Sequence, residues 1–268
     1  MKNKLNKNSF LSHLNLLKEY VKITLASAME YRLSYIIQTI TMFLNDCVWI
    51  LLWVIFFNKF NEVNGWQLNE MIMLYAVVTL SVGIGGFFFG NRNRIAKVIA
   101  EGRLDFYLPL PKNVLFHCLI SRSSSFSLGD ILFGLVMGLL VLSWWQWPLF
   151  LLLVMLSSII VISFGIIVSS LGFYWGNAEN TAERLFHGLL AFSTYPYSIF
   201  KGLTRLLILL VIPAGFVSGI PVELLKSFNW QWLLVTIIFT ILILLIAIFI
   251  FYKGLKRYES GSMITLRT

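Results

Sequence analysis

The sequence has few of the residues on which soluble enzymes and metal sites depend. Only 12% of its 268 residues are charged, about half of the roughly 25% that is usual in soluble domains. Its two cysteines, Cys47 and Cys118, lie far apart and in or beside apolar runs. A cysteine metal site is therefore excluded, and a disulfide is not expected. The rest is strongly apolar, with 58% hydrophobic residues and a mean hydropathy of +0.82, so we expect an integral membrane protein.

The motifs of common catalytic sites are also missing. There is no phosphate-binding G-x-x-x-x-G-K-[ST], no H-E-x-x-H and no G-x-S-x-G. We therefore expect neither catalysis nor a cofactor or metal on this chain. His13, His117 and His187 are scattered and are interpreted as ordinary interface residues. Glu179, Glu183 and His187 share one helical face, which could be a weak metal site or a partner contact, but we interpret it as a solvated face with a pair of side chains at i and i+4.

Long apolar runs separated by short polar connectors predict an all-α protein with six membrane-spanning helices. The expected spans are residues 35–57, 70–90, 114–142, 149–175, 198–219 and 230–252. They form one domain, 35–252, between an amphipathic N-terminal helix within 1–34 and a tail, 253–268. Charges interrupt the apolar part of 1–34, so this segment is expected to be retained rather than cleaved as a signal peptide. Residues 185–200 are apolar but are expected to form an interfacial or cytoplasmic helix.

The distribution of basic residues predicts the orientation. The formal net charge is +9. With six spans and both termini in the cytoplasm, 19 basic residues lie in inner segments and only Lys59 and Lys226 in outer loops. The positive net charge thus reflects the preference of basic residues for the inner side of the membrane and does not indicate nucleic-acid binding. The basic N-terminal helix is expected on the inner membrane surface. Six tryptophans are expected at the outer boundary: Trp66, Trp144, Trp145, Trp147, Trp230 and Trp232.

Small and acidic residues inside the spans predict helix contacts. Small residues recur at four-residue spacing in the second span, and Gly134 and Gly138 do so in the third, which favours close approach of two helices over simple flexibility. Asp46 and Asp130 lie within spans, where a carboxylate costs roughly 2.5–3.5 kcal/mol. Arg122 or Arg205 could pair with either of them. The pair of acids could line a substrate path or act as a polar clamp between helices.

The longest polar interruption is residues 91–113, NRNRIAKVIAEGRLDFYLPLPKN. Ile95, Val98 and Ile99 form one apolar edge, which predicts a short surface helix. Gly102 is placed to end this helix in a left-handed conformation, Pro109 and Pro111 prevent its continuation, and Asn113 can cap the next helix. We expect a short rigid helix on the inner side; an ordered cytoplasmic loop is the alternative.

Residues in this segment and elsewhere in the chain resemble a known family of membrane proteins. EGRLDFYLPLP at 101–111 resembles the G-x-L-D-x-x-L-x-x-P signature that follows the second span of ABC-2 type permeases. YRLSY at 31–35, and YPYSIFKGLTR at 195–205 before VIPAGFVSGIP at 211–221, are further matches, while Leu110 stands where we expect an arginine. The resemblance implies a transmembrane permease subunit of an ATP-binding cassette transporter, an exporter in most of the family, which works by alternating access.

The resemblance also implies partners. Two copies of a separate ATPase would hold ATP and Mg, and a second permease, identical or homologous, would complete the complex in a cell membrane, for example the bacterial plasma membrane. Residues 91–113 would be the coupling segment that docks on the ATPase, through Arg94, Lys97, Glu101, Gly102, Arg103, Asp105, Leu108 and Pro109. Two alternatives stay open: an ion-coupled carrier or channel that uses Asp46 or Asp130, and a membrane-embedded enzyme that acts on lipids.

Overall fold

The computed structural model describes residues 10–175 and 178–259. The expected terminal regions 1–34 and 253–268 are thus seen only in part, because residues 1–9 and 260–268 lie outside this description. Within the described ranges there is no β-strand, only one isolated bridge between Val63 and Trp66. The longer helices are α1 (Phe10–Glu30), α2 (Arg32–Lys59), α3 (Leu68–Phe88), α6 (Ser127–Val141), α7 (Trp147–Ser169), α8 (Glu179–Ser193) and α11 (Trp230–Leu255).

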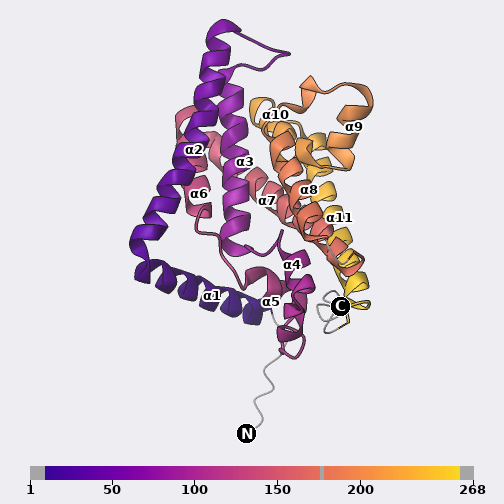
Figure 1. The fold of residues 1–268 in the computed structure, drawn as a ribbon. Helices are drawn as coiled ribbons and strands as arrows, with labels where there is room; N and C mark the ends of the chain where they lie inside the picture. Colours follow the sequence, from indigo (N-terminus) through magenta and orange to yellow (C-terminus); the bar gives the residue numbers. More distant parts are fainter. Residues whose placement is uncertain (1–9, 176–177, 260–268) are drawn as a thin grey trace.

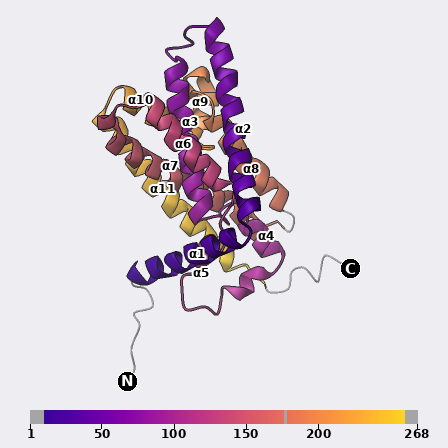
Figure 2. The ribbon, with the colours of Figure 1, turned by 90° about the vertical axis from the view of Figure 1, so that its left-hand side faces the viewer.

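Short helices connect these longer helices. They are α4 (Ile95–Ala100), η1 (Arg103–Phe106), α5 (Val114–Ile120), η2 (Trp144–Gln146), η3 (Ser170–Phe173), η4 (Tyr197–Ile199), α9 (Gly202–Leu210), η5 (Gly215–Gly219) and α10 (Ile220–Lys226). Helices α2, α3, α6, α7, α8 and α11 run lengthwise as a bundle, and α1 lies crosswise beneath them (Figures 1 and 2). We call the end with α1, α4 and α5 the basal end, and the end with α10 and the loop 60–67 the far end.

In the part of the chain that the structure describes, four helices are long and apolar enough to cross a membrane: α2, α3, α7 and α11. They correspond to the expected spans 35–57, 70–90, 149–175 and 230–252. The pair formed by α9 and the η5–α10 segment passes the same test as a bent unit, and α6 is apolar but shorter. The structure is consistent with an integral membrane protein. The two remaining expected spans, 114–142 and 198–219, are not single straight helices.

The expected span 114–142 is not one helix. It is divided into α5 and α6 by the non-helical residues 121–126. The backbone there hydrogen-bonds to the end of α3: the Gly90 N–H donates to the Arg122 carbonyl at 2.9 Å, and the Ser124 N–H donates to the Gly86 carbonyl at 3.0 Å. Because these long-range bonds replace the helical ones, α5 lies at the basal end beside α1, and only α6 runs with the bundle (Figure 2).

The expected span 198–219 is also interrupted. Its two parts meet at 73°, in a break that contains Pro213, which has no N–H to donate. The hairpin stays at the far end, where the Lys226 ammonium donates to the Gly65 carbonyl at 3.0 Å. Lys201 and Arg205, which were expected on the inner side, therefore lie at the far end.

Helix α8 occupies the region for which an interfacial or cytoplasmic helix was expected. It begins beside α4, where Lys97 and Glu179 form an ion pair at 3.2 Å. It ends near the far half of α2, where the Tyr195 and Trp53 ring centroids are 6.0 Å apart. Its buried residues, Ala182, Phe186, Leu189 and Ser193, recur at helical spacing, and α8 packs against α7. The helix therefore runs along the bundle instead of across its end (Figure 1).

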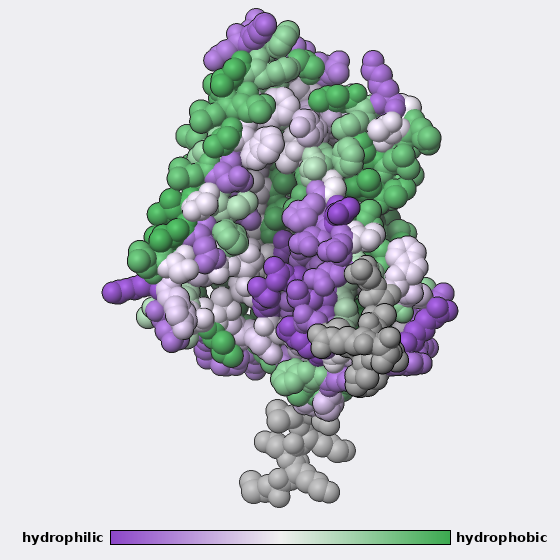
Figure 3. Space-filling view, viewed as in Figure 1, coloured by the Kyte–Doolittle hydropathy of each residue, from purple (hydrophilic) through white to green (hydrophobic). Residues whose placement is uncertain are grey.

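The centre of the bundle is the close contact between α3 and α6. A Cβ atom placed on Gly134 would be 2.7 Å from the Leu80 Cβ, and one on Gly83 would be 2.8 Å from the Ile131 side chain. The expected approach of helices through small residues is confirmed at this contact. By contrast, the outer faces of α2 and α11 carry exposed leucine and isoleucine side chains, and apolar surface covers the α2 flank in Figure 3.

Candidate functional site

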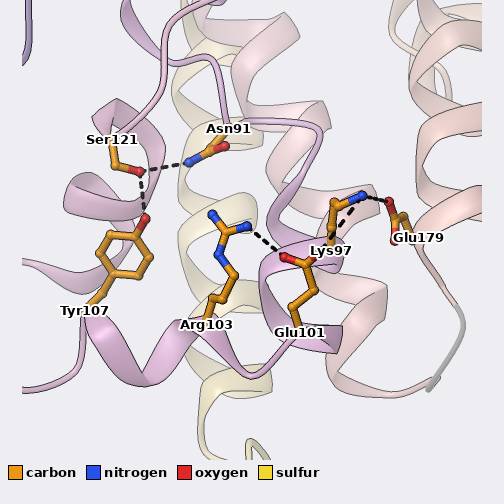
Figure 4. Close-up of polar contacts among 7 residues, drawn as sticks. All are labelled: Asn91, Lys97, Glu101, Arg103, Tyr107, Ser121 and Glu179. Carbon is orange, nitrogen blue, oxygen red and sulfur yellow. Dashed lines mark hydrogen bonds and ion pairs between the residues drawn. The ribbon is translucent and has the colours of Figure 1, made fainter. Parts of the chain in front are cut away.

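The segment that follows α3 is held to the bundle by two buried residues, Asn91 and Arg92. The Asn91 amide donates to the Cys118 carbonyl at 2.9 Å and to the Ser121 hydroxyl at 2.8 Å. The Tyr107 hydroxyl lies 2.8 Å from the same Ser121 oxygen (Figure 4). The Ser169 hydroxyl donates to the Arg92 carbonyl at 3.3 Å. Both ends of the segment are thus tied to α5 and α7.

The short helix expected in this segment is α4, and its apolar edge faces the protein. Ile95, Val98 and Ile99 are buried, as is Ala96. A Cβ atom on Gly172 of η3 would be 2.9 Å from the Ala96 Cα, so the two backbones are in close contact. Gly102 has φ +68° and ψ 7°, which confirms the left-handed helix end.

Asn113 also acts as expected at the start of α5. Its side-chain oxygen accepts a hydrogen bond from the Phe116 N–H at 3.0 Å, which confirms the predicted cap. Between Gly102 and this cap, the chain forms η1 and then the turn that contains Pro109 and Pro111. The segment therefore consists of a short helix, a tight reversal and the start of a second helix.

Charged side chains brace α4 on its solvent side. Lys97 pairs with Glu179 of α8 at 3.2 Å and lies 3.9 Å from Glu101, and Arg103 pairs with Glu101 at 2.8 Å (Figure 4). These side chains are 30–61% exposed, so each pair contributes at most about 1 kcal/mol. Their main effect is to connect α4 with the start of α8, over which hydrophilic side chains gather in Figure 3.

The end of η1 and the turn that follows it carry an exposed apolar surface around Phe106 and Leu108, which we call the tip. Phe106 is 68% exposed and Leu108 is 43% exposed. Arg94, Arg103 and Pro109 are exposed as well, whereas Leu104 and Tyr107 between them are buried. Asp105 lies beside Tyr258, and burial together with this carboxylate raises the pKa of Tyr258 to about 12. The tip is therefore a small apolar surface that a well-held segment presents at the basal end.

Helix α1 is fastened to α5 by a tyrosine–histidine contact. The Tyr20 hydroxyl lies 2.6 Å from His117 Nε2, and the His13 and Phe116 rings meet edge to face at 5.1 Å. Burial lowers the pKa of His117. His13 and His117 are thus interface residues at the base of the bundle.

The two intramembrane acids come together. The Asp46 and Asp130 carboxyl groups, from α2 and α6, lie close enough to each other to interact, and both residues are buried. The cation within electrostatic reach of Asp130 is Arg92. Its guanidinium group also lies 5.3 Å from the Phe186 ring centroid, so it is enclosed between α3, α6 and α8. These three side chains form a buried charge cluster, which we call the Asp–Asp–Arg cluster.

Neither arginine that the sequence suggested joins this cluster. Arg122 is exposed, and burial of part of its side chain together with the charges of Arg94 and Arg103 lowers its pKa. Arg205 lies over the Tyr197 ring, with its guanidinium carbon 4.9 Å from the centroid. Arg92 was missed because it lies outside the expected span 70–90, two residues after its end. The available signal was the length of its side chain, which can reach back along the helix end.

The acidic face of α8 does not assemble a metal site. Among the described residues, no three His, Cys, Asp or Glu side chains are placed to hold a metal ion. Glu179 turns to Lys97, while Glu183 and His187 lie 3.9 Å apart.

The comparison with protein families identifies the chain. A family model described as ABC-2 family transporter protein matches residues 43–262, which include α3 to α11 and most of α2. The chain belongs to this family. No curated protein and no solved structure matches it. This ABC-2 protein is therefore a multi-pass transmembrane subunit of an ABC transporter, and the match contains both the tip and the Asp–Asp–Arg cluster.

Proposed function

We propose that this ABC-2 protein is the permease subunit of an exporter that is driven by a separate ATPase. The partner holds ATP and Mg, and two permeases, identical or homologous, assemble with two ATPases in a cell membrane such as the bacterial plasma membrane. Hydrolysis drives alternating access of the spans. The observation that carries this proposal is the exposed tip at Phe106 and Leu108 on a segment that is otherwise held by buried residues.

In this proposal the chain crosses the membrane six times, through α2, α3, α6, α7, α8 and α11. The α9–α10 hairpin enters from the outer side and returns. The basal end is cytoplasmic, because 13 of the 17 basic residues in the described ranges lie there. The other four, at the far end, are Lys59, Lys201, Arg205 and Lys226.

The exposed side chains of α1 agree with this orientation. Leu11, Leu14 and Leu25 are exposed in the structure, although they belong to the apolar face of the helix. An amphipathic helix that keeps such residues off the protein is suited to lie on the inner membrane surface. The tryptophans that mark the outer boundary lie in η2, at the starts of α7 and α11, and in the loop 60–67. This arrangement supports the proposal that both termini lie in the cytoplasm.

The tip transmits movement of the ATPase to the spans. A force on Phe106 reaches α4 and η1 first. From there it passes to α5 through Asn91, to α7 through Arg92, and to α8 through the pair of Lys97 and Glu179. The coupling residues proposed from the sequence occupy two places: Leu108 and Pro109 lie at the exposed tip, while Lys97, Glu101 and Arg103 brace the helix.

The Asp–Asp–Arg cluster acts as a clamp in this proposal and not as a substrate path. The helices beside it leave no room for a ligand, since a Cβ atom on Gly129 would be 2.6 Å from the Thr39 carbonyl oxygen. Asp46 and Asp130 are 5% and 7% exposed. Substrate would pass along another surface, such as one between two permeases.

The test is a pair of matched substitutions at opposite ends. Phe106 is 68% exposed at the basal end, and Phe228 is 59% exposed at the far end. The tagged full chain is purified from its native membrane, and the co-purified Mg-dependent ATPase activity is measured. Phe106→Asp should lower this activity at least tenfold, because burying a charge in a docked apolar contact is unfavourable, and Phe228→Asp should leave it unchanged.

Two outcomes contradict the proposal. One is a wild-type preparation that never contains an ATPase; the other is a Phe106→Asp variant that retains it as well as Phe228→Asp does. The ion-coupled carrier is the second candidate, because Asp46 and Asp130 are neighbours. The carrier would be supported by a substrate flux that depends on protons or sodium, needs no ATPase and is abolished by Asp46→Asn.

A further inference from the structure

An apolar groove runs lengthwise between α7 and α11 toward the basal end. Its volume is about 380 Å³. Two stripes of side chains at helical spacing line it, one from α7 and one from α11: Ile159, Ile162, Ile166, Leu244, Ile248 and Tyr252. From Leu244 to Tyr252 the groove follows α11 for about 12 Å, at 1.5 Å per residue. Phe116 of α5 and His13 of α1, whose rings meet edge to face at 5.1 Å, line its basal end.

The polar side chains of the groove lie at one end of it. Among its twelve lining residues, only His13, Asn113 and Tyr252 carry polar side chains. All three belong to the basal end: His13 to α1, Asn113 to the start of α5, and Tyr252 to the last turns of α11. The Tyr252 hydroxyl is close enough to the Asn113 side chain and the Leu115 backbone to interact with both. The groove therefore leads from a polar mouth to an apolar interior, which matches a ligand with one polar and one apolar end.

A cation lies beside the polar mouth. The Lys112 ammonium donates a hydrogen bond to the Ser12 hydroxyl, and these two residues directly precede Asn113 and His13 in the chain. None of the side chains that line the groove is acidic. An anionic group at the mouth would therefore meet one positive charge and no opposing negative charge.

The apolar interior fits a hydrocarbon chain and not a peptide. A peptide laid along the groove would place its backbone N–H and C=O groups against isoleucine and leucine side chains, where they stay unpaired at a high cost. A hydrocarbon chain carries no such groups. On the next face of α11, Leu245 and Phe249 are 61% and 65% exposed and continue the apolar surface, and α7 and α11 are both long enough to span a membrane. Lipid chains are thus the surroundings of this groove.

We propose that the groove binds one acyl chain of a phospholipid from the leaflet at the basal end, with the lipid phosphate at Lys112. The site does not depend on the proposed transport function. It would add the lipid to the contacts that join α1 to the bundle, because His13 of α1 lines the groove.

The experiment measures binding of defined lipids to the purified, delipidated full chain by native mass spectrometry. The probes are dioleoylphosphatidylglycerol and dioleoylglycerol, which has the same chains without the phosphate. One phosphatidylglycerol should bind about fivefold more tightly than dioleoylglycerol, the effect of one ion pair at a half-buried cation, and Lys112→Gln should remove this difference. Leu244→Trp, which fills the groove, should weaken the binding about tenfold or more.

Two substitutions close by serve as matched controls. Leu245→Trp adds the same ring on the exposed face of α11. Lys253→Gln removes a basal cation that lies over the Phe249 ring at 5.8 Å and does not line the groove. Both variants should bind phosphatidylglycerol as the wild type does. Because Lys112→Gln changes a side chain outside the bundle, it tests the site even if Leu244→Trp does not fold.

Four outcomes would overturn the proposal. Equal weakening by Leu244→Trp and Leu245→Trp would mean that lipid covers α11 without a site. Dioleoylglycerol binding as tight as that of phosphatidylglycerol would assign the groove to any apolar molecule, and unchanged binding in Lys112→Gln would remove the phosphate from this residue. Unchanged lipid binding in Leu244→Trp, together with the loss of a permease dimer, would assign the groove to a second copy of the chain.

Discussion

Three glycines at different contacts allow the packing between α3 and α6 to be measured. Gly134 lies against α3, where an added Cβ would be 2.7 Å from the Leu80 Cβ and 2.9 Å from the Ala76 carbonyl oxygen. At Gly138 the nearest atom, on Trp147, would be 3.4 Å away, and at Gly188 on α8 nothing lies within 4 Å. Replacing each glycine by alanine therefore adds the same methyl group to a tight, an ordinary and an open site.

The expected loss follows from these distances. Ordinary contact begins near 3.4 Å, and the added Cβ would lie 2.7 Å from the Leu80 Cβ. Gly134→Ala therefore forces α6 and α3 apart by about 0.7 Å in a core that has no spare volume. Overpacking of this kind costs about 1–3 kcal/mol. Alanine also raises helix propensity by up to about 1 kcal/mol, but this gain is shared by all three variants. The difference between Gly134→Ala and Gly188→Ala therefore isolates the packing cost.

The assay is equilibrium unfolding of the full chain in mixed detergent–SDS micelles, followed by circular dichroism. Gly188→Ala should match or exceed the wild type, Gly138→Ala should lie below it by less than about 1 kcal/mol, and Gly134→Ala should be the least stable. If Gly134→Ala is as stable as Gly188→Ala, α3 and α6 are not in backbone contact at Leu80, and the reasoning is refuted.

Three further predictions concern the basal end and the Asp–Asp–Arg cluster. Gly102→Ala should destabilise the chain by about 1–2 kcal/mol in the same unfolding assay. The positive φ of this residue is the whole cause, since nothing lies within 4 Å of the added Cβ, and Gly102→Asn should cost less. Equal stability of the wild type and both variants would contradict a left-handed conformation at the end of α4. Arg92→Met should destabilise the chain, because the buried Asp130 carboxyl group loses the positive charge within its electrostatic reach. A double-mutant cycle with Asp130→Asn should return a coupling of about 0.5–3 kcal/mol; a coupling of zero would show that the two side chains do not interact. Burial lowers the pKa of His117 from 6.5, so the state in which α1 has left α5 binds more protons, and docking of α1 should weaken as the pH falls below about 6.5. Limited proteolysis within α1 should therefore accelerate between pH 7.5 and 5.5 in the wild type. A His117→Gln variant that shows the same acceleration would exclude this histidine as the cause.

Patterns that depend on neighbouring residues were read correctly from the sequence. The runs that became α2, α3, α7 and α11 are apolar over enough residues to span a membrane, and this property survives any packing arrangement. The α4 helix, its end at Gly102 and the Asn113 cap were foreseen for a similar reason. Each depends on side chains and backbone angles within a few residues.

The errors lie where distant parts of the chain compete for the same backbone groups. An apolar run at 114–142 looked like one span, but hydrogen bonds from Gly90 and Ser124 join its middle to the end of α3. Likewise, residues 185–200 were expected to be interfacial or cytoplasmic, because a further span there would have moved the basic C-terminal tail to the outer side, although the apolar stripe of α8 fits the side of α7. In both cases the local hydropathy was right, and the direction of the helix was decided by its neighbours.

The sequence by itself determined that this ABC-2 protein belongs in a membrane, which runs are helical, and that residues 91–113 form a short rigid insertion, because composition and local backbone preferences suffice for these conclusions. Only the tertiary structure decided that Arg92, and not Arg122 or Arg205, lies beside Asp130, and that Phe106 is left exposed at the tip. A long side chain can reach several partners from one position in the sequence, and the packing of α3, α6 and α8 selects one of them.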